Sequence, residues 1–453
     1  MLKRVHHRSE MLSHLLQGFS CIGCFLLFYG LMAIPNWPLR HLSRTTATTL
    51  LTWFAMGSAM LAVFGRMELR CGKLSQQAAG QIAGVLITDG VTYVQLQIMN
   101  VNPNNNAHLT LFGVDFWYLL LAAVLQSLLI FLLVRAGARM LPRVEKPAQV
   151  LLITASDGEN CRQKLINQHA FWQISTVCSW ESPALRELLK EFDTIMLAPD
   201  VPYTTRMRLM KTCYHLRKTV LVSPKVQEIM LTNARRLILD DMAFLELRDG
   251  SMTMWQAAVK RAADIVCSFL ALVILSPLLG VIALAIHFED GGSVFFRQQR
   301  LTLDGRAFTI YKFRTMRMGD EHMSAMQDDD RITRVGRVLR RWRLDELPQF
   351  WNILRGDMSM VGPRPEMLEN IRRYKSELPE FEFRERMKAG LTGYAQIEGR
   401  YNTSPEDKLM LDLFYIEGFS LWTDVKLLLR TLTVFFRSDA TAGFQPPENQ
   451  QGK

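Results

Sequence analysis

The sequence predicts a membrane protein with three parts: a helical membrane bundle, an α/β domain and a mainly helical module. Four apolar stretches precede residue 140, and from Val150 short β-rich runs alternate with amphipathic helical ones. A further apolar run, from Ile265 to Ile286, has Ser276 and Pro277 at its centre. Hydrophobic residues make up 49% of the 453 residues, which also favours a membrane protein.

Residues 1–146 are expected to form a four-helix transmembrane bundle. Its apolar stretches, each close to the ~20 residues needed to cross a bilayer, run over 15–34, 46–64, 78–99 and 112–134. Clusters of Lys and Arg flank the outer ends of the first and fourth stretches and the loop between the second and third, so both ends of the bundle are placed in the cytoplasm. The third stretch carries Asp89, which requires a partner inside the bundle.

Residues 147–248 are predicted to form a Rossmann-like cytosolic domain. Apolar runs at 150–155, 172–178, 192–199 and 219–224 indicate strands, and the segments between them have helical character. The first turn, "TASDGEN", lacks the GxGxxG of a dinucleotide site. A scaffolding or regulatory role is therefore favoured over dinucleotide binding.

Residues 249–440 are predicted to form a mainly helical module, followed by a polar tail at 441–453. Within it, a re-entrant membrane helix is expected at 262–287 because cations flank the apolar run on both sides. Pro277 removes a helix hydrogen bond and its ring clashes with the Val273 carbonyl, to which the Ser276 hydroxyl could donate instead. The alternative, a kinked helix that spans the membrane, stays open on these grounds.

The net charge of +10 suits an anionic partner. The basic run "RITRVGRVLRRWR" contains no recognisable nucleic-acid-reading motif and accompanies membrane elements, so lipid headgroups are expected as its partner and nucleic acid is not. Seven scattered cysteines show no disulfide framework.

Asp345 and Glu346 are the candidate catalytic carboxylates. On a helix, neighbouring side chains point about 100° apart, so the two cannot share one proton, and separate roles are expected: one attacks and the other holds a cation. The pair lies in an apolar, arginine-rich neighbourhood, and Arg364 is held between Pro363 and Pro365, whose fixed φ stiffens its presentation. Such arginines suit a phosphate ligand.

Five ordered blocks between Lys260 and Phe436 resemble the bacterial sugar transferase family, the monotopic phosphoglycosyl transferases. They are "KRAADIVCSFLALVILSPLL", "GSVFFRQQRLTLDGRAFTIYKFRTMR", "LRRWRLDELPQFWNILRGDMSMVGPRPEM", "KAGLTGYAQIEGR" and "FYIEGFSLWTDVKLL". The whole layout resembles the large subgroup that begins surface polysaccharide and O-antigen synthesis.

The resemblance implies an enzyme that transfers hexose-1-phosphate from a UDP-sugar, glucose or galactose by the subgroup, to undecaprenyl phosphate and releases UMP. It implies that Asp345 is the nucleophile, carrying a covalent phosphosugar, and that Glu346 is a ligand of Mg²⁺. It places the catalytic module on the cytoplasmic face of the bacterial inner membrane. A homodimer is compatible with this architecture.

By motif position, the resemblance assigns the remaining site residues. Arg364 and Arg400 would bind phosphate, Lys312 and Arg314 would line the basic site, and Gln396 and Asp424 would help to place donor groups, although a helix-capping role suits Asp424 equally well. The family commonly has Pro-Gly where this chain has Ala389-Gly390, and Asn where it has Glu398. These departures put the nucleotide or sugar preference in doubt.

Two other function classes fit the sequence less well. A regulatory protein with a decayed catalytic module has no reason to keep Asp345, Glu346, Arg364 and Arg400 together. A polytopic transporter is disfavoured because too few apolar spans are available.

Overall fold

The computed structural model describes residues 2–64, 74–100, 111–144, 148–155, 172–247, 252–317, 331–399 and 404–434. It divides into two compact units, residues 1–223 and 224–453. Over the ranges described, five helices are long and apolar enough to cross a membrane. The chain is therefore a membrane-associated protein of mixed α and α/β structure, as its composition indicates.

The first unit begins with four long helices that pack on one another. These helices, joined after the first by the short helix η1 (Trp37–Arg40), are α1 (Leu2–Met32), α2 (Arg44–Phe64), α3 (Leu74–Asn100) and α4 (Val114–Val144). α1 packs on α4, α2 on α3, and α3 on α4. Asp89 is buried, and its Oδ1 accepts a hydrogen bond of 2.9 Å from Trp53 Nε1, which is the partner inside the bundle that its position requires.

An α/β part completes the first unit. Its four strands are β1 (Ala148–Thr154), β2 (Trp172–Ser179), β3 (Thr194–Leu197) and β4 (Thr219–Val222). They pair in parallel in the order β2-β1-β3-β4, with helices α6 (Leu185–Glu191) and α7 (Tyr203–His215) in the connections. The parallel sheet is confirmed, whereas the helix expected near 158–168 lies outside the described residues.

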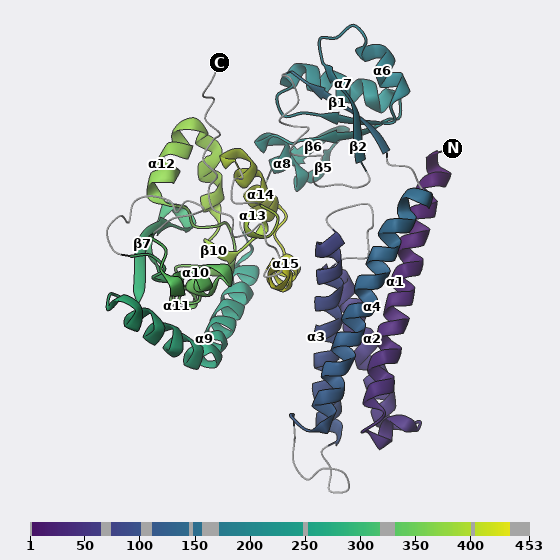
Figure 1. The fold of residues 1–453 in the computed structure, drawn as a ribbon. Helices are drawn as coiled ribbons and strands as arrows, with labels where there is room; N and C mark the ends of the chain where they lie inside the picture. Colours follow the sequence, from purple (N-terminus) through teal and green to yellow (C-terminus); the bar gives the residue numbers. More distant parts are fainter. Residues whose placement is uncertain are drawn as a thin grey trace, which may run out of the picture. The chain divides into compact units, whose positions relative to one another are not determined.

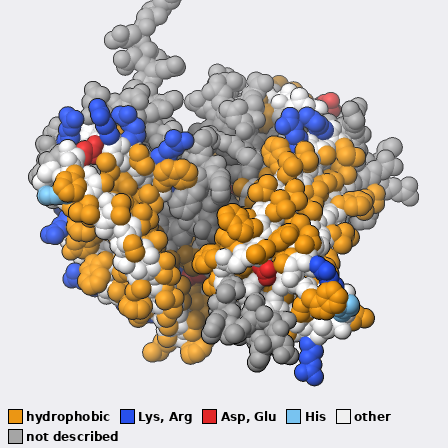
Figure 2. Space-filling model, turned by 60° about the horizontal axis from the view of Figure 1, so that its bottom comes forward, with side chains coloured by type: hydrophobic (Ala, Val, Ile, Leu, Met, Phe, Trp, Pro, Cys, Tyr) orange, Lys and Arg blue, Asp and Glu red, His pale blue; other side chains and the backbone are white. Residues whose placement is uncertain are grey.

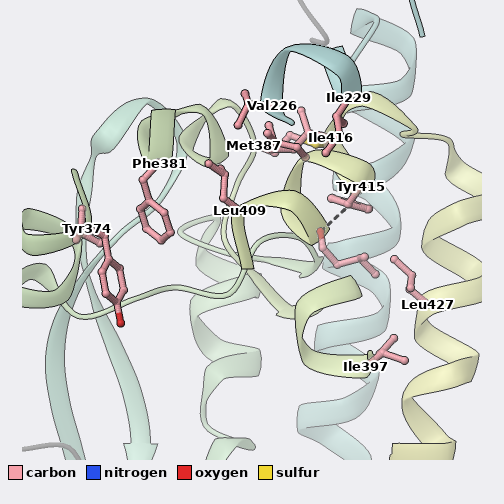
Figure 3. Packing of buried hydrophobic residues seen from close by; sticks show 13 residues of the cluster. Val226, Ile229, Tyr374, Phe381, Met387, Ile397, Leu409, Tyr415, Ile416 and Leu427 are labelled. Atoms are coloured by element: carbon pink, nitrogen blue, oxygen red, sulfur yellow. Dashed lines mark hydrogen bonds between the residues drawn. The ribbon is translucent and has the colours of Figure 1, made fainter. Parts of the chain in front are cut away.

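The second unit begins earlier than the module predicted at 249. Helix α8 (Val226–Thr232) contributes Val226 and Ile229 to the apolar core of this unit, beside Leu409 and Ile416 (Figure 3). A hairpin follows, made of β5 (Arg235–Leu239) and β6 (Met242–Glu246). From sequence these residues are expected in the α/β domain, because the apolar face of α8 does not reveal which core it enters.

Helix α9 (Met254–Asp290) is capped by Thr253 at its start and by Gly291 at its end. The Thr253 side chain accepts from Gln256 N, and Gly291 takes the left-handed φ of 71° that closes many helices. Figure 1 shows α9 as two limbs that meet at a bend. Ser276 Oγ donates a 2.7 Å hydrogen bond to the Val273 carbonyl, the one that Pro277 cannot engage.

Both limbs of α9 form hydrogen bonds with other elements of the second unit. Near the start of the helix, Arg261 donates to the carbonyls of Ile353 (2.7 Å) and Leu354 (2.8 Å). Near its end, Glu289 Oε1 accepts from Arg334 N at 2.7 Å. Between these ends, ten large hydrophobic side chains of α9 from Ile265 to Phe288 are exposed, and Figure 2 shows hydrophobic side chains covering this surface with Lys and Arg at its margins.

The rest of the second unit combines short helices with two small sheets. Its strands are β7 (Phe295–Leu301), β8 (Ala307–Phe313), β9 (Ser359–Val361) and β10 (Gly390–Thr392). Its helices are η2 (Leu303–Gly305), α10 (Arg334–Arg341), η3 (Leu344–Glu346), α11 (Gln349–Arg355), α12 (Leu368–Glu377), η4 (Pro379–Arg386), α13 (Tyr394–Ile397), α14 (Pro405–Glu417) and α15 (Leu421–Val434). The antiparallel β7-β8 hairpin was not anticipated from the sequence.

Candidate active site

The Asp345-Glu346 pair lies on a tight turn between α10 and α11. Thr333 caps α10 by accepting from Gly336 N at 2.9 Å. After α10 the chain turns at Arg343, whose φ of 51° is uncommon for a residue other than glycine. The pair follows at once in the single turn η3, so a strained backbone position introduces the two carboxylates.

Glu346 forms ion pairs with two basic side chains. Its Oε1 accepts from Lys312 Nζ at 2.8 Å and from Arg364 NH2 at 3.1 Å. Lys312 lies on β8 and Arg364 follows β9, so three parts of the chain converge on this oxygen. Burial by itself would raise the pKa of Glu346, but Lys312 and Arg364 together bring it below its ordinary value. Glu346 is therefore ionised.

Asp345 is perturbed in the opposite direction. Burial and the neighbouring negative charge of Glu346 raise its pKa to about 6, against the opposing effect of Lys312 and Arg340. Two adjacent carboxylates whose pKa values are pushed apart are suited to different tasks. The separate roles expected for the pair thus have a physical basis in their surroundings.

The backbone around Arg364 is held at close range by a neighbouring strand. β9 pairs in parallel with β10, Gly362 N donates to the Thr392 carbonyl, and Gly390 N donates to the Pro363 carbonyl, both at 2.9 Å. A Cβ on Gly362 would lie 2.2 Å from the Lys388 carbonyl oxygen. Only glycine allows this approach. The close pairing of the two strands places Arg364, two residues further along the chain, next to Glu346.

The other basic residue of "YKFRTM", Arg314, is buried. Its backbone N–H donates to the Val294 carbonyl at 2.9 Å, and its guanidinium lies against Gly292, where a Cβ would meet it. The next residue, Thr315, accepts from Arg340 Nε at 2.9 Å. Arg314 therefore sits at the junction of β8 and the end of α9, next to the turn that Arg340 leads into.

The remaining predicted site residues lie elsewhere or are not described. Gln396 is buried on α13, with its Nε2 3.5 Å from the Gly390 carbonyl. Asp424 on α15 pairs with Lys260 of α9 and accepts from Tyr415 Oη at 2.7 Å. Arg400 lies outside the described residues. The structure thus brings Asp345, Glu346, Lys312 and Arg364 together, and it places Asp424 in a buried contact between helices.

Glu346 is the carboxylate that the family resemblance assigns to a magnesium ion. Among the described residues no group of three or more His, Cys, Asp or Glu side chains gathers as an all-protein metal site. Mg²⁺, however, is commonly bound by one or two carboxylates together with substrate phosphates and water. The donor set here suits an ion that a phosphate substrate helps to hold.

Three charged residues that support the backbone around Arg364 were not predicted from the sequence. Arg300 NH1 donates to the Pro365 carbonyl at 3.2 Å, and Arg384 NH2 donates to the Arg364 carbonyl at 2.6 Å. Asp412 pairs with Arg384 at 2.8 Å. No spacing links these residues, which come from β7, η4 and α14, so the sequence held no signal for their meeting.

The profile of the bacterial sugar transferase family matches residues 255–438, the part of the chain that carries this site. A UDP-glucose:undecaprenyl-phosphate glucose-1-phosphate transferase of Caulobacter vibrioides is 43% identical over 188 residues, which are 40% of this chain and 70% of that protein. The chain belongs to the bacterial sugar transferase family.

Other relatives match this chain across about half of their own length. A UDP-N-acetylgalactosamine-undecaprenyl-phosphate N-acetylgalactosaminephosphotransferase of Aeromonas hydrophila is 38% identical over 213 residues, 46% of this chain and 50% of that protein. A UDP-glucose:undecaprenyl-phosphate glucose-1-phosphate transferase of Escherichia coli is 38% identical over 239 residues, 50% of this chain and 51% of that protein. The chain thus spans about half of the length of these relatives.

Proposed function

We propose that this sugar transferase moves a hexose-1-phosphate from a UDP-sugar to undecaprenyl phosphate and releases UMP, as a first membrane step of surface polysaccharide synthesis. The names of the relatives support this reaction class. The observation that carries the proposal is the pairing of Glu346 with Lys312 and Arg364 beside Asp345, whose raised pKa sets it apart.

In the proposed reaction Asp345 is the nucleophile. Its carboxylate oxygen attacks the β-phosphorus of the UDP-sugar, an Asp345–phosphorus bond forms, and the bond from that phosphorus to the bridging oxygen breaks as UMP leaves. A phosphate oxygen of undecaprenyl phosphate then attacks the same phosphorus and expels Asp345. The product is undecaprenyl diphosphate hexose, and the carboxylate is regenerated.

The cations around Glu346 support this chemistry electrostatically. A diphosphate repels an attacking carboxylate, so charge must be neutralised before the two can meet. Lys312 and Arg364 are placed to do so, and Arg314 and Arg400 are proposed to add to the basic surface. Glu346 would hold Mg²⁺ when it is bound, and the ion would withdraw negative charge from the phosphate oxygens.

We place the site on the cytoplasmic face of the inner membrane, with α9 entering and leaving by that face. Arg261 and Glu289 lie at opposite ends of the apolar part of α9, yet both are bonded to backbone groups of the same compact unit. A helix that crossed the bilayer would separate these ends by about 30 Å of hydrocarbon. The bend at Ser276 and Pro277 favours a return instead.

The proposal names glucose or galactose as the sugar, and the relatives act on glucose, galactose or N-acetylgalactosamine by their names. Glu398, one of the departures from the common family pattern, lies next to α13 and pairs with Arg430 at 3.8 Å. This stretch is the part of the module in which a preference among sugars is most readily tested.

The test uses the purified full chain with Mg²⁺, undecaprenyl phosphate and, in separate reactions, UDP-glucose, UDP-galactose or UDP-N-acetylgalactosamine. UMP release and the mass of the lipid product are measured. At least one donor should give both UMP and the matching lipid diphosphate sugar, and Asp345→Asn should give neither. Absence of product with every donor, or turnover by Asp345→Asn, would contradict the reaction or its nucleophile respectively.

A further inference from the structure

The segment Pro363–Arg364–Pro365 is held by an unusual set of donors. Each of its three consecutive carbonyls accepts a hydrogen bond: that of Pro363 from Gly390 N at 2.9 Å, that of Arg364 from Arg384 at 2.6 Å, and that of Pro365 from Arg300 at 3.2 Å. The two prolines fix φ on either side of Arg364. Little backbone freedom remains at the residue whose guanidinium meets Glu346.

Two of the three donors are buried or half-buried guanidinium groups. The Arg384 side chain is 5% exposed, and that of its partner Asp412 is 2% exposed. Arg384 also stacks over Phe381, with its Cζ 4.8 Å from the ring centroid. Arg300 donates a second bond, of 2.6 Å, to Gln298 Oε1 within β7. Both guanidinium groups are therefore fixed from at least two sides.

A buried ion pair is a costly way to hold a loop. The desolvation of Arg384 and Asp412 can exceed the gain from their attraction, and an apolar pair of similar volume often gives equal or greater stability. What the pair supplies is direction, because the ion pair with Asp412 holds the guanidinium in place, and the charge-assisted hydrogen bond from this guanidinium to the Arg364 carbonyl is strong and geometrically specific. Since Arg384 binds the backbone of Arg364 itself, this direction is passed to the site.

We infer that Arg384, oriented by Asp412, and Arg300 are positioning residues that aim the Arg364 side chain at the phosphate site. This inference rests on the proposed function, because it assigns these residues to the placement of a phosphate-binding arginine. Neither Arg384 nor Arg300 is required to touch the substrate. Their effect on the reaction should pass through Arg364 alone.

A double-mutant cycle tests this directly. Arg384→Lys keeps the charge, but its single ammonium cannot serve Asp412 and the Arg364 carbonyl with the geometry of a guanidinium. In the full chain we expect it to lower kcat/KM for UMP release about tenfold or more. In an Arg364→Lys background the same change should have an effect below about threefold, because the aimed group is already altered. An equal loss in both backgrounds would overturn the inference.

A matched control comes from the first unit of the chain. Arg206 of α7 is fully buried and likewise donates to a backbone carbonyl, that of Ser223, at 2.7 Å. Arg206→Lys should therefore change kcat/KM by the same factor in the wild-type and Arg364→Lys backgrounds. Coupling of Arg206 to Arg364 as strong as that of Arg384 would show that the cycle reports general loosening, and the inference would fall.

A second variant guards against a failure to fold. If Arg384→Lys unfolds well below the wild-type melting temperature, Arg300→Lys on β7 enters the same cycle with the same expectation, since it contacts a different carbonyl. The wild-type reaction separates the two proposals: no UMP from the wild type contradicts the function, whereas wild-type turnover with additive variants contradicts only the positioning role.

Discussion

Lys312 Nζ lies 2.8 Å from Glu346 Oε1, while the adjacent carboxyl of Asp345 has its pKa raised to about 6. Glu346 is thus paired with protein cations, whereas burial and the neighbouring charge raise the pKa of Asp345. This asymmetry within two consecutive residues leads to predictions for both pH dependence and stability.

The first prediction concerns the pH dependence of turnover. The nucleophile must be ionised, and the raised pKa of Asp345 means that protonation begins to remove it near pH 6. We expect kcat/KM to be level above pH 7 and to fall about tenfold for each pH unit below 6. UMP release measured from pH 5 to 8, with a melting curve at each pH, checks this. Constant activity down to pH 5 in folded protein would disprove it.

The second prediction is that neutralising each carboxyl has opposite effects on stability. The pKa of Asp345 is raised in the folded state, so ionisation of this carboxyl above its ordinary pKa lowers the free energy of unfolding. This stability is lost as the pH rises towards 6. Asp345→Asn should therefore raise the melting temperature at pH 7.5. Glu346 has a lowered pKa and stabilises the fold above its ordinary pKa, a contribution lost as pH falls.

Glu346→Gln should accordingly destabilise the protein by about 2 kcal/mol, the scale of a lost hydrogen bond to a charged group. Both variants are compared with the wild type by thermal unfolding at pH 7.5 in a chelating buffer. A shift in the same direction for the two variants would show that their surroundings do not differ in this way.

The third prediction concerns the bend of α9. Pro277→Ala restores the backbone N–H that proline withholds from the Val273 carbonyl, so the helix should straighten and the ends of its apolar part should no longer reach the same unit. We expect activity to fall about a hundredfold, the scale of a misplaced site. A single cysteine introduced at Ser293 should react with an impermeant reagent only from the cytoplasmic side in the unchanged helix.

Gly280→Ala provides the matched control in the same helix, because no atom lies within 4 Å of the position its Cβ would take. It should leave both activity and labelling unchanged. External labelling of the Ser293 cysteine while Pro277 is retained would contradict the re-entrant arrangement.

The fourth prediction concerns Asp424, which the family resemblance linked to donor placement and which suited a helix-capping role equally well. Its carboxylate pairs with Lys260 and accepts from Tyr415, so Asp424→Asn leaves a buried ammonium without its counter-charge. We expect a loss of about 3 kcal/mol in stability with little change in KM for the UDP-sugar. Thermal unfolding and initial rates separate these effects, and a large rise in KM at unchanged stability would restore the binding role.

The sequence predicted the parallel sheet and the apolar helices because each leaves a local pattern. Strand runs such as 150–155 alternate with helical ones, and Pro277 identifies the carbonyl that Ser276 takes up. The family resemblance assigned separate roles to Lys312 and Glu346, and their ion pair was not predicted. These predictions depend on residues close in the chain or joined by a known pattern.

Contacts between distant residues were not predictable in the same way. Arg384 and Asp412 are 28 positions apart on different helices, and an arginine in "FEFRER" looks like a solvated surface residue. The placement of α8 failed for a similar reason, because Val226 and Ile229 only show that the helix is amphipathic. Which core receives an apolar face is decided by tertiary packing.

The re-entrant arrangement proposed for α9 would have a mechanical consequence for the bilayer. A helix that inserts and returns adds cross-sectional area to one leaflet and none to the other, so it would act as a wedge. In that arrangement the exposed side chains of α9, among them Ile274 (71%) and Val281 (64%), would fill space between acyl chains on one side only. Loosely packed or curved leaflets should accommodate such a wedge at lower free-energy cost, which makes the lateral pressure of the membrane a determinant of how deeply the carboxylate pair sits.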